Sequence, residues 1–145
     1  LGEGSLRSSL ETLAKELKIH QSILMPGFVN NPYAWLEKAS IFTLASDHEG
    51  MSNALLEAQA LGLPSVATDC PFGTAEVIIN NKTGVLIETR NTIQLAEGLI
   101  RLVLNKKLCE EMGAAAKINI ATNFTSKKHI NSLRHLFETI YTEKL

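Results

Sequence analysis

The chain has 145 residues, which is enough for one ordinary domain and too few for two. A composition of 45% hydrophobic and 20% charged residues excludes intrinsic disorder and low-complexity classes. Fourteen lysines and arginines nearly balance fifteen aspartates and glutamates, for a net charge of −1. This balance gives no support for a nucleic-acid partner or for binding to an anionic membrane.

Two cysteines, Cys70 and Cys109, are too few for a disulfide framework or a four-ligand zinc site. No apolar run reaches the roughly 18 residues of a membrane-spanning helix, and the segment from Leu1 to Arg7 does not resemble a signal peptide. The sequence therefore predicts a cytoplasmic protein with reduced thiols and with no cofactor or metal.

The first part of the chain alternates between two hydrophobic periods. Leucines at helical spacing predict a helix over residues 6–17, and the short apolar run Ile23–Met25 predicts a strand that Pro26 stops. Asn31-Pro32 opens a predicted short helix that reaches Ala39. The continuous apolar run Ile41–Ala45 is typical of a strand buried on both faces.

The same alternation continues to the C-terminus. Ser52 is the predicted N-cap of a helix that runs to about Leu61. The remaining predicted elements are a strand at Ser65–Thr68, a helix at Thr74–Ile79, a strand at Val85–Ile87 and helices at Ile93–Leu104, Lys107–Ile120 and Ser126–Tyr141.

Strands that alternate with helices predict the α/β class, a Rossmann-like parallel sheet with helices on both faces. Ligands of such sheets bind beyond the carboxyl ends of the strands. The loops expected at that edge carry polar and glycine residues: Gly2–Ser5, Pro26–Asn31, Ser46–Ser52 and Asp69–Gly73.

The loop after Ile41–Ala45 is the most informative of these. It carries Glu49, and Glu57 lies two turns into the following helix. Between them, Gly50 permits close backbone approach, and the first amides of the helix, beginning at Met51, favour an anion such as phosphate. The two carboxylates are about 10 Å apart if the interval is helical, which exceeds the roughly 5 Å of a retaining two-carboxylate hydrolase. The spacing suits a nucleotide sugar, with hydroxyls at both ends and phosphates between.

Six blocks of the sequence, in order and spacing, resemble the nucleotide-sugar-binding domain of retaining GT-B glycosyltransferases, glycosyltransferase family 4. The resemblance covers nearly the whole chain, and its details are similar to bacterial members that build surface polysaccharides. The blocks are Gly2–Arg7, Pro26–Val29, Glu49–Ala58, Ala60–Asp69, Gly73–Ile78 and Thr83–Ile87.

The resemblance implies roles for individual residues. Glu57 matches the glutamate that accepts hydrogen bonds from the ribose hydroxyls, and Glu49 matches the catalytic one at the transferred sugar. The stretch of Gly50, Met51, Ser52 and Asn53 matches the backbone that contacts sugar hydroxyls and diphosphate.

Other candidates lie around these residues. Phe28 and Val29 match the loop that meets the base, and Gly2, Gly4 and His48 are further candidates at the rim of the same cleft. The chain departs from the family pattern at Phe72 and Thr74, on the sugar side, and at Gln59, where methionine is usual.

The resemblance also implies that residues 1–145 are a partial donor-binding domain, without its first two strands and without the Arg–Lys pair that neutralises the diphosphate. The acceptor-binding domain would be missing too, and with it the glycan or lipid-linked acceptor and any peripheral membrane contact. We therefore expect the chain alone to be inactive.

The absence of the first two strands would affect how the remaining strands pair in the sheet. The segment from Ile41 to Ile87 has complete crossovers, so we expect it to keep a three-stranded parallel sheet. The strand at Ile23–Met25 should be detached from it, or paired in a way that the full domain does not use.

Two alternatives remain open on the sequence. One is another enzyme of the same fold, such as a nucleotide-sugar epimerase or a glycan phosphorylase, although no lysine stands out for pyridoxal. The other is a non-catalytic nucleotide-sugar-binding module. A dinucleotide dehydrogenase is disfavoured because no Gly-x-Gly-x-x-Gly follows a strand.

Overall fold

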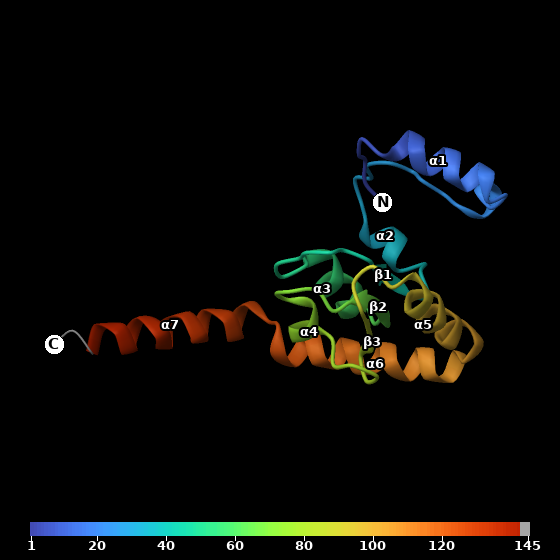
Figure 1. The fold of residues 1–145 in the computed structure, drawn as a ribbon. Helices are drawn as coiled ribbons and strands as arrows, with labels where there is room; N and C mark the ends of the chain where they lie inside the picture. The colour runs from blue at the N-terminus through green and yellow to red at the C-terminus, as the bar shows by residue number, and fades with distance from the viewer. Residues whose placement is uncertain (143–145) are drawn as a thin grey trace. The chain divides into compact units, whose positions relative to one another are not determined.

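The computed structural model describes residues 1–142 (Figure 1), which divide into two compact units, the first Leu1–Trp35 and the second beginning at Leu36. The first unit contains helix α1 (Arg7–Glu16) and a short 3-10 helix, η1 (His20–Ser22). The leucine stripe predicted for residues 6–17 does form α1, but Leu10 and Leu13 remain about half exposed and only Ala14 of the helix is buried.

The segment Ile23–Met25 is not a strand, so this sequence prediction was wrong. A strand requires a neighbouring ladder, and the sheet found in the described part of the chain contains only strands from the second unit. The carbonyl of Met25 accepts a hydrogen bond from Arg7 Nη2 (2.9 Å) instead. The predicted detachment of this segment from the sheet is confirmed.

The short helix α2 (Tyr33–Leu36) lies at the boundary between the two units. The amide of Ala34 donates to Asn31 Oδ1 (3.3 Å), and Pro32 stands just before the helix. Asn31-Pro32 thus opens the helix as predicted, since an asparagine side chain satisfies a first-turn amide and proline needs no donor there.

The second unit is built on a three-stranded parallel sheet, as predicted. Strands β1 (Phe42–Leu44), β2 (Ser65–Thr68) and β3 (Gly84–Ile87) lie in the order β1-β2-β3. Phe42 is opposite Ser65, and Ser65 is opposite Gly84. Parallel neighbours require crossover connections, and helices supply them.

Five helices complete the second unit within the described residues. Asn91 and Asn105 cap two of them, because their Oδ1 atoms accept hydrogen bonds from Gln94 and Leu108 amides, both at 3.0 Å. The helices are α3 (Asn53–Ala60), α4 (Thr74–Val77), α5 (Thr92–Leu104), α6 (Lys106–Asn123) and α7 (Ser126–Thr142).

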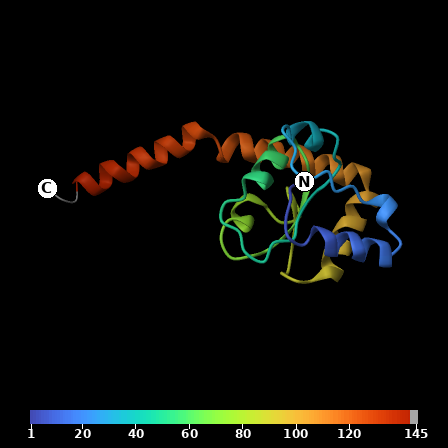
Figure 2. The same cartoon turned by 90° about the horizontal axis from the view of Figure 1, so that it is seen from above.

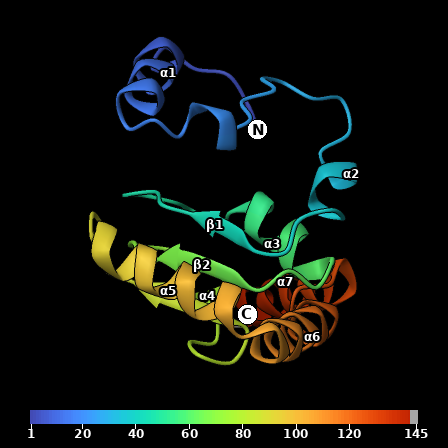
Figure 3. The ribbon, with the colours of Figure 1, turned by 90° about the vertical axis from the view of Figure 1, so that its right-hand side faces the viewer.

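Helices cover both faces of the sheet, as the fold class requires (Figure 3). Successive side chains of a strand point to opposite faces, so Ala67 of β2 enters a cluster with α3, α4 and the end of α6, while Val66 enters another with α5 and the start of α6. The first cluster has Leu55, Val77 and Ile120 among its buried members; the second has Ile87, Leu102 and Met112.

Helix α6 contributes to both clusters, and α7 follows it along the chain (Figure 2). The side chains of α7 from Ser126 to Tyr141 are exposed. None of the helices described in residues 1–142 has both the length and the apolar character that crossing a bilayer demands.

Candidate functional site

The carboxyl ends of the strands are joined by hydrogen bonds between the loops that leave them. Thr68 at the end of β2 donates from Oγ1 to the carbonyl of Ser46, in the loop after β1, at 2.5 Å. The amide of Asp69 donates to the carbonyl of Ile87, the last residue of β3, at 2.7 Å. The two predicted loops of the second unit, Ser46–Ser52 and Asp69–Gly73, therefore start from one rigid edge.

The loop after β1 presents Glu49 from this edge. Its Oε1 accepts a hydrogen bond from Ser46 Oγ at 2.7 Å, within a single turn of chain. Glu49 is partly exposed, and the neighbouring His48 and Gly50 are exposed. The carboxylate is thus held at the surface and remains available to a ligand.

A second loop lies directly against this one. A Cβ on Gly73 would come within 2.0 Å of the Gly50 carbonyl oxygen. Gly73 also has φ +99°, a conformation that strains any other residue. Glycine at position 73 therefore lets the loop after β2 touch the loop that carries Glu49.

An ion pair ties the same loop to the chain after β3. Arg90 Nη2 lies 2.8 Å from Asp47 Oδ2, and its Nε donates to the same oxygen at 2.9 Å. The hydrogen bond from Arg90 holds the pKa of the Asp47 carboxyl below its usual range, with a smaller contribution from the arginine charge. Arg90 is 81% exposed, so solvent screens this pair and it orders the loop more than it stabilises the fold.

Helix α3 begins where this loop ends. Ser52 occupies the predicted N-cap position, with extended backbone angles of φ −72° and ψ 108°, but its side chain makes no capping hydrogen bond. The residue is 8% exposed. The helix lacks internal partners for its first four amides, which the observed start places at Ser52, Asn53, Ala54 and Leu55. Met51, which we expected among them, precedes the helix and is 47% exposed.

Glu57 is the fifth residue of α3 and is partly exposed. The backbone advances about 6 Å from Asn53 to Glu57 at 1.5 Å per residue. Leu55 and Ala58 of the same helix are fully buried, and Leu55 packs in the cluster that contains Ala67 of β2. The core therefore fixes the rotation of α3 and the direction in which Glu57 leaves it.

The first unit brings together the other predicted residues. Gly2 donates from its amide to the carbonyl of Gly27 (2.8 Å), next to Phe28 and Val29. Phe28 is 83% exposed. This hydrogen bond joins the turn that contains Gly2 and Gly4 to the loop that carries Phe28 and Val29.

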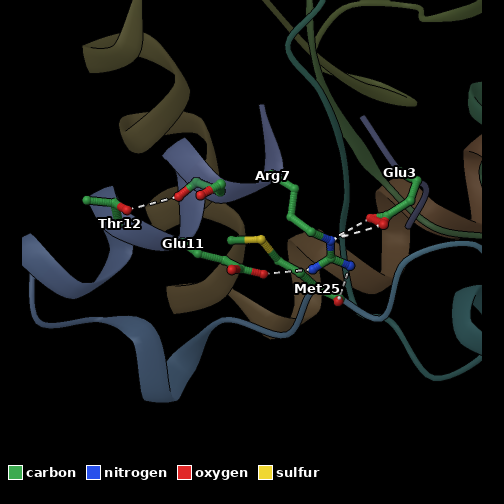
Figure 4. Close-up of polar contacts among 6 residues, drawn as sticks. Glu3, Arg7, Glu11, Thr12 and Met25 are labelled. Atoms are coloured by element: carbon green, nitrogen blue, oxygen red, sulfur yellow. Dashed lines mark hydrogen bonds and ion pairs between the residues drawn. The ribbon is translucent and has the colours of Figure 1, made fainter. Parts of the chain in front are cut away.

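Arg7 holds this arrangement in place (Figure 4). Its guanidinium donates to Glu3 Oε1 (2.5 Å), to Glu11 Oε1 (2.9 Å) and to the carbonyl of Met25. A Cβ on Gly27 would lie 3.3 Å from Arg7 Nη2, so the guanidinium packs closely under the loop. The two carboxylates keep the pKa of Arg7 above its usual value, mainly through their hydrogen bonds.

The sequence analysis missed the residues that order the site. Ser46, Thr68, Gly73 and Arg90 were not singled out, although the first three lie in or beside the expected loops. Thr68, Gly73 and Arg90 contact segments far away in the chain, which no local pattern reveals, whereas Ser46 bonds to Glu49 only three residues away. Within residues 1–142 no three histidines, cysteines, aspartates or glutamates gather into a group that could hold a metal ion.

A cavity of about 450 Å³ lies at the opposite edge of the sheet, before β1 and β2. Ile41, Pro64, Leu102 and Cys109 are among its lining residues. Burial, with a smaller effect of Glu110, raises the pKa of the Cys109 thiol. We do not assign the site to this cavity, because the polar loops with Glu49 and the start of α3 lie at the carboxyl edge.

Comparison with known proteins gives the site a context. The family described as "Glycosyl transferases group 1" matches residues 1–119. The chain is 38% identical over 108 residues to N-acetylgalactosamine-N,N'-diacetylbacillosaminyl-diphospho-undecaprenol 4-alpha-N-acetylgalactosaminyltransferase of Campylobacter jejuni, covering 74% of this chain and 30% of that one. It is 28% identical over 138 residues to poly(ribitol-phosphate) alpha-N-acetylglucosaminyltransferase of Staphylococcus aureus, covering 95% of this chain and 28% of that one.

A solved structure agrees with these relatives. A variant of TarM from S. aureus, in complex with fondaparinux, alpha-GlcNAc-glycerol and UDP, superposes with a TM-score of 0.88 at 28% identity. The match covers 94% of this chain and 28% of that one. The chain thus spans less than a third of each of these three proteins. Its parallel sheet covered by helices, together with the likeness to the TarM structure, confirms the predicted α/β class.

Proposed function

We propose that this chain, which belongs to the family of group 1 glycosyl transferases, is the donor-binding part of a retaining glycosyltransferase. The enzyme would transfer a sugar from a nucleotide sugar to a glycan or lipid-linked acceptor in the cytoplasm, in bacterial surface polysaccharide synthesis. Residues 1–145 would form a partial donor domain that is inactive alone.

One observation carries the proposal: a helix N-terminus without a side-chain cap, with a carboxylate on either side of it. Glu49 precedes the start of α3, and Glu57 follows in its second turn. Unpaired amides and the helix dipole favour phosphate oxygens, and carboxylates accept hydrogen bonds from sugar hydroxyls. A ligand with a diphosphate between two sugars satisfies all three groups together.

Each end of this ligand has a separate task. Glu57 would accept hydrogen bonds from the ribose hydroxyls, which fixes the nucleotide end. Glu49 would contact the transferred sugar, where positive charge develops as the bond to the diphosphate breaks. The amides from Gly50 to Asn53 would hold the diphosphate as negative charge grows on it, the kind of electrostatic contribution that is the largest in many enzymes.

The relatives suggest the class of donor. Two of them are named as transferases of N-acetylgalactosamine and N-acetylglucosamine, and the TarM complex contains UDP. We therefore propose a UDP-N-acetylhexosamine as the donor. Phe28 and Val29 are our candidates for contact with the uracil, and Gly2, Gly4 and His48 are further candidates for contact with the donor.

A donor screen of the full-length gene product tests the proposal. Purified enzyme is incubated with a panel of UDP- and GDP-sugars and a cell-wall acceptor extract, and released nucleotide and labelled product are measured. We expect transfer from UDP-N-acetylhexosamine with retention of the anomeric configuration. Glu49→Gln should lower transfer strongly and leave a residual activity, while the exposed control Glu97→Gln should keep full transfer. Release of nucleotide without a product, or an inverted product, would contradict the proposal.

A further inference from the structure

We propose that Ser46 is a positioning residue that holds the Glu49 carboxylate in the orientation that sugar transfer requires, and that Thr68 anchors it. This inference rests on the proposed function, because it assigns to Ser46 an effect on the reacting end of the donor.

The first link joins Ser46 to Glu49. Ser46 Oγ donates to Glu49 Oε1 at 2.7 Å, a charge-assisted hydrogen bond between a hydroxyl and a carboxylate. A glutamate side chain has three torsions, and a partly exposed glutamate samples several rotamers unless a contact selects one of them. The serine occupies one oxygen of the carboxylate and directs the other away from itself.

The second link joins Ser46 to the sheet. Its carbonyl accepts a hydrogen bond from Thr68 Oγ1 at 2.5 Å, and Thr68 is 2% exposed at the end of β2. Thr68 is paired with Ile87 in the parallel ladder. The Ser46 backbone is therefore tied to the middle strand of the sheet, and the orientation of Glu49 derives from a rigid element rather than from the loop alone.

Other contacts limit the movement of the loop without reaching the carboxylate. Gly73 packs on the Gly50 carbonyl, and Arg90 pairs with Asp47. These contacts fix the path of the backbone. The Ser46 hydroxyl, by contrast, bonds to the Glu49 carboxylate itself, which separates its role from that of its neighbours.

Kinetics of the full-length gene product provide the first test. Ser46→Ala should lower kcat about tenfold, a change of about 1.4 kcal/mol in the barrier, while the donor KM changes less than twofold. Ser46→Thr, which keeps the hydroxyl, should restore most of kcat. The matched control Ser132→Ala removes a hydroxyl that bonds the Lys128 carbonyl on α7 and should change neither constant.

A double-mutant cycle shows whether Ser46 acts through Glu49. In a Glu49→Gln background with residual activity, the further change Ser46→Ala should cost less than twofold. An undiminished tenfold loss there, or an unchanged kcat for Ser46→Ala alone, would overturn the positioning role while transfer by the wild-type enzyme still supported the proposed function.

Crystal structures separate the two proposals further. In Ser46→Ala the Glu49 carboxylate should adopt a new rotamer or lose its density, and in Ser46→Thr it should stay in place. An unmoved carboxylate in Ser46→Ala would overturn the inference. A wild-type enzyme that transfers no sugar would refute the proposed function. The crystal structures of Ser46→Ala and Ser46→Thr would still decide whether Ser46 positions Glu49.

Discussion

At the scale of single residues, the two carboxylates of the candidate site are held in different ways. Glu49 depends on a side-chain hydrogen bond from Ser46. Glu57 depends on the packing of α3, whose Leu55 and Ala58 are fully buried. Substitution of either glutamate should therefore leave the fold intact and report on the ligand.

Glu57→Gln in the full-length enzyme should weaken donor recognition by about 1.5–3 kcal/mol, the usual worth of a hydrogen bond to a charged group. Both the donor KM and kcat should suffer, because a tilted nucleotide misplaces the anomeric carbon. Steady-state kinetics with varied donor check this, with Glu97→Gln as the matched control. Unchanged donor kinetics would remove Glu57 from the site.

The ion pair of Asp47 and Arg90 predicts a pH effect. Because the folded pKa of Asp47 lies below its unfolded value, the pair stabilises the loop above about pH 4 and loses this effect as the pH falls through the folded pKa. A ¹³C NMR titration of the Asp47 carboxyl should give a pKa that rises toward the ordinary value in Arg90→Ala. Arg134→Ala, on α7, should leave it unchanged. Equal pKa values in the wild type and Arg90→Ala would refute the pairing in solution.

At the scale of elements, the strands and helices of the second unit could be predicted because their periods were unambiguous. β2 was predicted to the residue, because Gly62-Leu63-Pro64 ends the preceding helix and a polar loop follows from Asp69. Helix α4 ends at Val77 and not at the predicted Ile79. The amide of Ile79 donates to Thr83 Oγ1 (2.9 Å), a contact from the next turn of chain that periodicity does not reveal.

The error at Ile23–Met25 has a related cause. An apolar run of three residues has the composition of a strand whether or not a partner strand exists, and the partner decides the outcome. The same limit applies to the site: Glu49 and Glu57 could be predicted from spacing around a helix start, whereas the Ser46 hydrogen bond and the Gly73 approach arise only in the folded chain.

Helix α6 offers a test of close packing. A Cβ on Gly113 would lie 2.1 Å from the Gly62 carbonyl oxygen. Alanine normally favours a helix by about 1 kcal/mol over glycine, so Gly113→Ala would stabilise a helix that had room for the methyl group. Because the Gly62 carbonyl occupies that room, we expect Gly113→Ala to lower the free energy of unfolding, measured with urea. The control Ala114→Gly, at an exposed position of the same helix, should lose about 1 kcal/mol. A more stable Gly113→Ala would contradict the close packing of α6 on this loop.

At the scale of the whole molecule, the predicted site residues fall into two groups. Gly2, Gly4, Phe28 and Val29 belong to the first unit, and His48 to Glu57 belong to the second. Within each unit the structure brings its group together. The prediction that both groups face one nucleotide sugar stays a prediction, and it concerns a chain that spans less than a third of the two relatives compared above.

The second unit carries the central claim, because it contains the start of α3 and both glutamates. Its sheet is covered on both faces and holds most of the buried residues. A ligand that binds there should therefore perturb a short, contiguous set of amides at the carboxyl edge, which can be observed without knowledge of the acceptor.

The most direct measurement is an amide NMR titration of the ¹⁵N-labelled chain with UDP and, separately, with inorganic phosphate at millimolar concentrations. The account predicts that UDP shifts the amides from Gly50 to Leu55, that Glu57→Gln reduces these shifts, and that phosphate alone produces much smaller ones. Equal shifts with phosphate, or UDP shifts confined to the opposite edge around Ser40 and Lys106, would contradict it.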